Sequence, residues 1–414
     1  MVTRLGDMAV GSTVKIKVNG ALKDFLIVQQ GSPGSGDNDF DGTWVLMTNI
    51  IEQMCFSSES NLMRFSDSDV IDYLNGEFLS SLVQGIRKEI KQVSVRDASN
   101  YEGEHYVSCK VFVLSASEVG ITTNSYGIEN IYPLSYFYGL TSTDKDCPKR
   151  VAYYESSKSK WWLRDFSRFS GVSTVYEDGT LNMIWSDTYG VGVRPAFILN
   201  SNLGVSSNGM VGTIPGITTD ATDLGEQNAP FTVAYTATDT GTGTLTITEK
   251  LDGEVKLTRT EVAPGTALTV DWLAEKVGYQ QVLNGAHTIT LEVDNGIMTA
   301  TKSITFTKNV TGAKVSLTAP LTADDTITVA ALTLEGSFPA DMSLTVGLSN
   351  NARDETPVWE NCTDIQRGES RAFAHHAFTN KTVAKGAAFN YKVTITRGES
   401  GVGGNITMIG GVIG

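Results

Sequence analysis

The sequence is poor in the residues that bind metals or act as nucleophiles. Its four cysteines and four histidines are scattered: Cys55, Cys109, Cys147, Cys362, His105, His287, His375 and His376. No two cysteines form a CxxC motif, and the adjacent pair His375 and His376 has no further ligand at zinc spacing, so no metal site is expected. We expect reduced cysteines packed in the interior. One disulfide between two of Cys55, Cys109 and Cys147 is the alternative.

The sequence also has few basic residues and no long apolar run. Lysine and arginine number 32 against 46 aspartates and glutamates, which gives a net charge of −14. Nucleic acids and anionic membranes attract clustered basic side chains, so neither partner is expected. The sequence contains no stretch of about 20 apolar residues, so no transmembrane helix is expected. The opening residues, MVTRLGDMAV, lack the apolar segment of a signal peptide, so synthesis in the cytoplasm is expected.

Catalytic motifs are absent as well. No nucleophile-elbow motif accompanies the histidines, and the many acidic residues give no means of choosing the two carboxylates that a glycosidase needs. The loop GSPGSGDNDFDG places Asp37, Asp39 and Asp41 at alternate positions, as in some calcium sites, but it lacks their downstream glutamate. A solvated turn is expected there instead. The sequence therefore predicts a protein without enzyme activity, metal or cofactor.

The length of 414 residues predicts about three domains. The first, residues 1–212, is predicted to have an α+β fold. Alternating strands lie near its start, and residues 65–90 repeat apolar side chains at helical spacing. This segment predicts two helices, the first capped by Ser66 or Ser68 and ended by Gly76.

The remaining residues predict two all-β domains. Residues 213–229 are rich in threonine, glycine and acidic side chains without apolar periodicity, which predicts a linker. Residues 230–308 alternate strictly and have turn pairs at Asp252-Gly253 and Asn295-Gly296, which predicts an immunoglobulin-like β-sandwich. Residues 309–414 alternate in the same way and end in NITMIGGVIG, an apolar, glycine-rich segment that we expect to be buried against other subunits.

The candidate binding surface lies between two apolar segments, WWLRD at 161–165 and GVGVRPAFIL at 190–199. Tryptophan pairs and continuous apolar runs are typical of a core. The segment between them is polar and aromatic, a composition typical of recognition surfaces. The predicted ligand-binding residues are Tyr176, Asp178, Asn182, Trp185, Asp187 and Tyr189. The tyrosine-rich loop from Tyr126 to Tyr138 is the secondary candidate.

WWLR followed by GVRPAF resembles the closing motif of C-type-lectin-like domains in Firmicutes and phage proteins, a family of unknown function. GTWVLM, SDVIDYLN and KVFVLSASEVG extend the resemblance over about the first half of the chain. The resemblance implies a C-type-lectin-like fold and, by similarity to the variable proteins of diversity-generating retroelements, a ligand surface in the insert. Formylglycine-generating enzymes share that fold but need a cysteine pair near its end, and residues 161–212 contain no cysteine.

The later segments carry two further resemblances. LTVDWLAEKVGYQQVLNGAHTITLEV resembles bacterial and phage immunoglobulin-like modules. WENCTDI, AFTNKT and KVTITRG resemble the terminal β domain of phage minor structural proteins. Together they imply a virion protein, as a head fibre, capsid decoration or tail appendage. Its expected partners are other virion proteins, a host-surface glycan or protein, and further copies of itself, with a trimer as the first guess. A bacterial surface adhesin and a carbohydrate-active enzyme are the alternatives.

Overall fold

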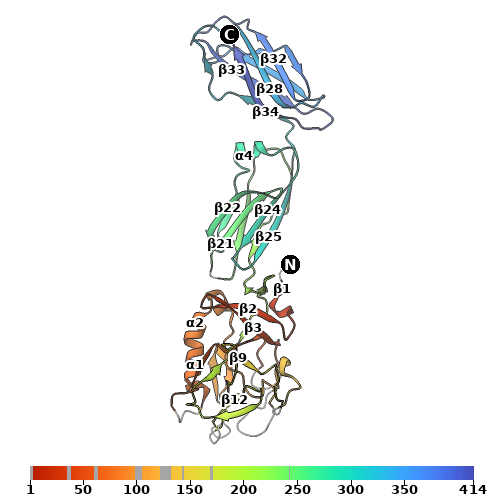
Figure 1. Ribbon diagram of the computed structural model, residues 1–414. Helices are drawn as coiled ribbons and strands as arrows, with labels where there is room; N and C mark the ends of the chain where they lie inside the picture. Colours follow the sequence, from red (N-terminus) through yellow and green to blue (C-terminus); the bar gives the residue numbers. More distant parts are fainter. Residues whose placement is uncertain are drawn as a thin grey trace.

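The computed structural model describes residues 3–34, 39–59, 64–97, 105–121, 132–141, 144–167, 171–241 and 243–414. It shows three bodies arranged end to end, with the first and the third at opposite ends (Figure 1). Each body has its own hydrophobic core, and these cores extend from Leu5 to Val211, from Val233 to Phe306 and from Ile327 to Val393. We call the bodies the first, second and third domains.

The α+β, C-type-lectin-like fold predicted for the first domain is wrong. The chain is nearly all β, with 47 % of its residues in strands and 9 % in helices, and the strands form many small sheets. The helical pattern in residues 65–90 does fold as helix, but only in short pieces. Most of the apolar residues of the core lie instead in buried strands such as TWVLM and AFIL, and this is why β structure dominates.

Two five-stranded sheets build the first domain. One has the order β2 (Thr13–Val18), β3 (Ala21–Gln30), β4 (Thr43–Met47), β15 (Ala196–Leu199) and β8 (Val111–Phe112). The other has the order β13 (Leu181–Ile184), β12 (Gly171–Val175), β11 (Trp161–Ser167), β14 (Val191–Val193) and β5 (Glu52–Met54). Three smaller sheets pair β1 (Thr3–Arg4), β16 (Gly204–Val205) and β17 (Val211–Gly212); β9 (Ala152–Tyr154) and β10 (Ser157–Ser159); and β6 (Val93–Arg96) and β7 (Tyr106–Cys109).

The helical region of the first domain begins where the sequence predicts. The Ser68 hydroxyl accepts a hydrogen bond from the Ile71 amide at 3.2 Å and caps the first helix. Gly76 does not end it, so that prediction is wrong: a π-helical turn passes through Gly76 because Leu74 and Phe78 pack into the core on either side. The segments are η1 (Leu5–Asp7), η3 (Phe65–Asp67), α1 (Asp69–Tyr73), η4 (Leu74–Phe78), α2 (Leu79–Ser81), α3 (Gln84–Glu89) and η5 (Ser135–Phe137).

The second domain is built from two sheets around one core. The smaller sheet has the order β18 (Gly216–Thr218), β20 (Val233–Thr238) and β23 (Ala267–Val270). The larger has the order β19 (Asp223–Gln227), β25 (Thr299–Lys308), β24 (Gly285–Asp294), β21 (Leu245–Leu251) and β22 (Glu254–Val262), and α4 (Lys276–Gln281) lies at one end. Asp252 and Gly253 both adopt positive φ at the β21–β22 turn, as their turn chemistry predicts.

The segment 213–229, predicted as a linker, belongs to the second domain instead. β18 pairs with β20, and β19 pairs in parallel with β25. Ile217, Ala221 and Leu224 pack against the core of this domain. The backbone hydrogen bonds of both strands are made to other strands, so the lack of apolar periodicity reflects edge strands, which are buried on one side only.

The first and second domains meet at a tightly packed junction. A Cβ added to Gly204 would lie 2.4 Å from the sulfur of Met298, and one added to Gly212 would lie 2.9 Å from Ile297. At the start of the second domain, directly after β17, the Thr213 carbonyl accepts a hydrogen bond from the side-chain amide of Asn295 at 2.9 Å. The β24–β25 turn therefore packs directly on the small sheet of the first domain, and only glycine leaves room for it.

The third domain also has two sheets. One contains β26 (Gly312–Ser316), β33 (Ala388–Thr396), β29 (Ser343–Ser349) and β30 (Glu360–Asn361), and β27 (Leu321–Thr322) pairs with β33. The other has the order β31 (Asp364–Arg367), β32 (Arg371–Ala377), β28 (Val329–Ser337) and β34 (Asn405–Ile413). The apolar end of the chain is thus the edge strand β34, with Ile406, Ile409 and Ile413 against the core.

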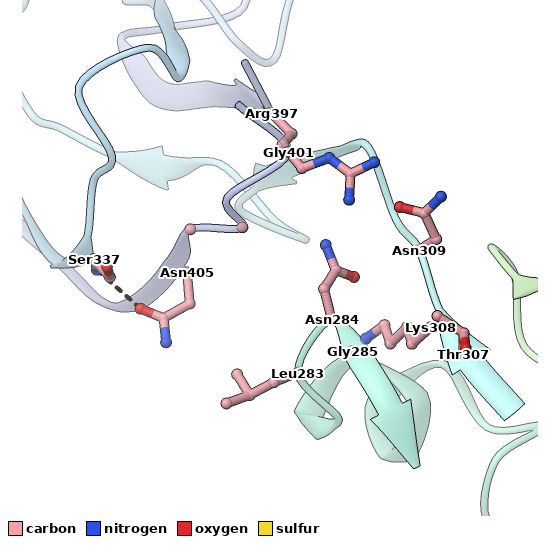
Figure 2. A pocket seen from close by; sticks show the side chains of 12 residues that line it. Leu283, Asn284, Gly285, Thr307, Lys308, Asn309, Ser337, Arg397, Gly401 and Asn405 are labelled. Carbon is pink, nitrogen blue, oxygen red and sulfur yellow. Dashed lines mark hydrogen bonds between the residues drawn. The ribbon is translucent and has the colours of Figure 1, made fainter. Parts of the chain in front are cut away.

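The second and third domains meet around an open cavity of about 430 Å³ (Figure 2). The Asn284 side chain donates to the Val310 carbonyl at 2.8 Å and accepts from its amide at 3.0 Å. One residue later, the Thr311 carbonyl accepts from the Arg397 amide of the third domain at 2.8 Å. The chain passes between the domains at Val310 and Thr311, and the space around this crossing is not filled by side chains.

The placement of residues 213–229 can be tested with two fragments of the second domain. Fragment 213–310 keeps β18 and β19, whereas fragment 229–310 lacks both. We expect the shorter fragment to be less stable by about 3 kcal/mol or more, because it loses the packing of three apolar side chains and two strands. Urea unfolding of both fragments measures the difference. Equal unfolding midpoints of the two fragments would show instead that residues 213–229 act as a linker.

Candidate functional site

The WWLRD motif lies at the centre of the first domain. Trp161 and Trp162, on β11, are both fully buried, which confirms that they are core residues. Their indole N–H groups donate to the carbonyls of Arg150 and Met54 at 2.9 and 3.0 Å. Buried tryptophan needs such a partner. The two indoles therefore connect strand β11 to the segments on either side of it.

Arg164, in the same motif, forms a buried ion pair with Glu118. The two guanidinium nitrogens donate to the two carboxylate oxygens at 2.6 and 2.8 Å, and both side chains are almost completely inaccessible to solvent. Arg164 also donates to the Val113 carbonyl at 3.0 Å. Two-point pairing of this kind fixes geometry as well as charge. The pair holds the segment after β8 against β11.

Arg194, in the GVGVRPAF motif, is also buried. Its Nε donates to the Met47 carbonyl at 2.8 Å, and its guanidinium lies 5.0 Å from the centre of the Trp161 ring. Burial lowers the pKa of Arg194 to about 10, so the side chain stays charged at neutral pH. The conspicuous arginines of both motifs therefore lie in the core and not on a binding surface.

The insert between the motifs forms the β12–β13 hairpin and the turns that follow it. Four predicted residues, Asn182, Trp185, Asp187 and Tyr189, are exposed there; the Trp185 side chain is 65 % exposed and that of Tyr189 is 76 % exposed. We call these four residues the tip surface. Strand β12 lies at the end of the molecule farthest from the third domain (Figure 1). The tip surface is thus aromatic, polar and open to solvent.

The other two predicted residues hold the hairpin turn. The Asp178 carboxylate accepts hydrogen bonds from the Thr180 hydroxyl at 2.6 Å and from its amide at 3.1 Å, and these bonds lower the pKa of Asp178. Tyr176 is half-buried, and its amide donates to the Thr180 carbonyl at 2.9 Å. Such contacts form a closed turn. Asp178 and Tyr176 therefore belong to the turn between β12 and β13, at the end of the hairpin opposite Trp185.

The secondary candidate is only partly described. Tyr126 lies outside the described residues, whereas Tyr132 and Tyr138 are 64 % and 75 % exposed. Tyr136 packs edge-on against buried Phe137, with the two ring centres 5.0 Å apart. In this loop, Tyr136 therefore packs against a core residue, whereas Tyr132 and Tyr138 are open to solvent.

A second concave surface lies outside both predicted segments. It is a groove of about 520 Å³ lined by Lys23, Asn49, Ile50, Ile51, Tyr153, Tyr154, Glu155 and Ser156, and we call it the hairpin groove because the β9–β10 hairpin forms one wall. Its residues come from three distant parts of the sequence and form no motif. The one sequence feature that could have indicated the groove is the pair Tyr153-Tyr154 just before a polar turn. This feature alone does not predict a site.

The described residues contain no group of three or more metal-binding side chains. Asp37 of the acidic loop lies outside them, so the calcium alternative rests on Asp39 and Asp41 alone there. All four cysteines are free, so none of the disulfides considered is formed. Within the described part of the chain, no helix is long and apolar enough to cross a bilayer.

Comparison with known proteins assigns no activity. A family model described as a domain of unknown function (DUF6273) matches residues 41–201, which include the tip surface and both motifs. No curated protein matches the chain. Among solved structures, the chicken CNTN1 FN1-FN3 domains match with a TM-score of 0.16 and 8 % identity, over 59 % of this chain and 94 % of theirs.

A second solved structure is the Bacteroides ovatus mixed-linkage glucan utilization locus SGBP-B in complex with a mixed-linkage heptasaccharide. It matches with a TM-score of 0.14 and 10 % identity, over 93 % of this chain and 89 % of that one. At such scores neither likeness carries an argument about fold or ligand.

Substitutions in the core and on the tip surface should differ strongly in their effect on stability. Replacing Arg164 by alanine removes the ion-pair partner of the buried Glu118 carboxylate, so we expect a loss of about 3–5 kcal/mol. Replacing Asn182, Trp185, Asp187 and Tyr189 together by alanine removes exposed groups, with about ±0.5 kcal/mol expected per site. Urea unfolding followed by tryptophan fluorescence compares the two. Early unfolding of the quadruple variant would show that the tip surface is structural.

Proposed function

We propose that this chain is a non-enzymatic structural protein of a bacteriophage virion that displays its first domain for attachment to the host surface. The second domain is a spacer and the third is the anchor. The ligand at the tip surface is a glycan or protein of the host cell. The proposal joins the sequence resemblances to phage proteins with the placement of the exposed residues.

The observation that supports this proposal best is the position of the tip surface. Trp185 and Tyr189 are exposed, and they follow strand β13, which pairs with β12 at the end of the molecule opposite the third domain (Figure 1). Exposed aromatic side chains cost free energy in water, and they supply contact area at small entropic cost when a ligand covers them. A protein held at its third domain would present this surface outward.

Attachment can be tested with fluorescent full-length protein and cells of the host bacterium. We expect alanine at Asn182, Trp185, Asp187 and Tyr189 together to weaken cell binding at least about tenfold, because a few aromatic contacts usually dominate such interfaces. The control is Val277→Ala, an exposed side chain on the second domain.

Two outcomes would contradict the attachment role. Normal binding of the quadruple variant excludes the tip surface, and a loss of binding in Tyr132→Ala/Tyr138→Ala instead would move the site to the tyrosine-rich loop. Antibodies against the chain should also label virus particles in electron micrographs. Particles that lack the label would exclude the virion role.

The third domain offers a surface for self-association. β34 is a nine-residue edge strand without a charged side chain, and Met408 and Val412 on its outer face are 49 % and 71 % exposed. Phe373, on β32 in the same sheet, is 50 % exposed. In contrast, the edge strand β22 of the second domain carries charged residues that discourage pairing, Glu254, Lys256, Arg259 and Glu261.

We propose that further copies of this chain cover that outer face. Two chains of charge −14 repel each other over most of their surfaces, and an uncharged apolar face lets like surfaces approach. Packing of the faces around a common axis gives the trimer expected from the resemblance, whereas antiparallel pairing of β34 edges across a two-fold axis would give a dimer.

Charged substitutions on the outer face test this arrangement. Met408→Lys/Val412→Lys should convert an oligomer into a monomer without unfolding the domain, because the core contacts of β34 are made by Ile406, Ile409 and Ile413. Val255→Lys on β22 is the control, since Val255 is similarly exposed at 53 %. Light scattering after size-exclusion chromatography gives the mass. A monomeric unmodified chain would exclude self-association.

A further inference from the structure

We propose that the hairpin groove of the first domain is a binding site for a neutral oligosaccharide, separate from the tip surface. Its volume of about 520 Å³ lies within the range of small-ligand sites. The lining combines two tyrosines with short polar side chains and one charge of each sign. This proposal does not depend on the virion role, because it rests on the groove alone.

The floor of the groove is rigid. Ile50 is buried, and a Cβ added to Gly192 would lie 2.5 Å from it, so the two segments are in close contact. The Ile50 amide donates to the Tyr153 carbonyl at 3.0 Å, and the Ile51 amide donates to the Val193 carbonyl at 3.0 Å. The tyrosine-bearing hairpin is thereby joined to the central sheet, as a preorganised site requires.

The polar side chains of the groove are available to a ligand. Lys23, Asn49 and Glu155 make no side-chain hydrogen bond or ion pair with any residue that the structure describes. Lys23 offers donors, Glu155 offers acceptors, and Asn49 offers both. A sugar hydroxyl is donor and acceptor at once, so a polyhydroxylated ligand can satisfy all three.

The charge of the lining favours a neutral ligand. One lysine and one glutamate leave no net charge, so a phosphate would face Glu155 and a free cation would face Lys23. Tyr153 is 42 % exposed, and Tyr154 lines the same groove. The flat, apolar face of a sugar ring packs well on such an aromatic side chain. Together, the neutral lining and the exposed tyrosine favour a saccharide as the ligand of the groove.

The turn of the hairpin is strained in a way that nothing in the domain compensates. Glu155 and Ser156 form the two-residue loop between Tyr154 and Ser157, with φ of 45° and 75°. Both values lie in the left-handed region, where asparagine and glycine are preferred. A glutamate there costs stability, and its side chain makes no hydrogen bond or ion pair with the described residues in return, a pattern typical of residues retained for binding.

The groove and the tip surface lie at opposite ends of one strand pair. Asn49, Ile50 and Ile51 precede β5, whereas Met54 at its other end pairs with Val191, two residues after Tyr189. The two sites therefore share no residue, although both adjoin this strand pair. This separation allows the two sites to be tested independently.

The test uses the full-length chain and three neutral hexasaccharide probes: maltohexaose, cellohexaose and hexa-N-acetylchitohexaose. We expect at least one to bind in isothermal titration, and Tyr153→Ala to weaken that binding at least about tenfold. Tyr106→Ala is the matched control, because Tyr106 is a tyrosine of the same domain outside the groove and is 43 % exposed, close to the 42 % of Tyr153, and this variant should bind normally. The quadruple tip variant should also bind the saccharide normally.

A second variant separates binding from folding. Glu155→Gly relieves the positive φ and should raise the melting temperature, yet weaken saccharide binding because it removes the acceptor. A merely structural turn would gain stability with no change in binding. No binding by any of the three probes, or binding that Tyr153→Ala and Glu155→Gly leave unchanged, overturns the proposal. Competition at these residues by inorganic phosphate or a serine hexapeptide would assign the groove to another ligand and overturn it as well.

Discussion

The first domain depends on the buried ion pair between Arg164 and Glu118. Removing two charges from water is costly, and the cost is offset only where the geometry is good and the remaining hydrogen bonds are made. Here both carboxylate oxygens are paired, and the guanidinium also reaches a backbone carbonyl. The pair can exist only if β11 and the segment after β8 lie in one relative position. It therefore helps to fix the two five-stranded sheets to each other, together with the core that they share.

Sequence patterns predicted the core of the first domain better than its class. The tryptophan pair, the VRPAFIL run and the Ser68 cap were predicted from side-chain chemistry that acts locally, and each is found as expected. The α+β class failed because helical spacing in one segment says nothing about how many strands surround it. Gly76 shows the same limit: its neighbours Leu74 and Phe78 hold the helix by tertiary packing, which overrides the local preference of glycine.

The candidate sites differ in how far the sequence could predict them. Trp185 and Tyr189 stand between two apolar motifs, so their exposure follows from the composition of one continuous segment. Asp178 has the same polar character, but its carboxylate turns inward to Thr180, and composition cannot distinguish these two uses. The hairpin groove joins Lys23, Asn49 and Tyr153 across more than a hundred residues. Only the fold brings such side chains together, so no local pattern could have indicated them.

The two junctions give the molecule an uneven stiffness. Between the first and second domains, Met298 and Ile297 fill the space over two glycines, so a bend there would break packed contacts. Between the second and third domains the chain crosses at Val310 and Thr311 beside an open cavity, and bending meets less resistance. We therefore expect bending to concentrate at the second junction. The first two domains would then swing together about that point, and the tip would sweep an arc whose radius is the length of both.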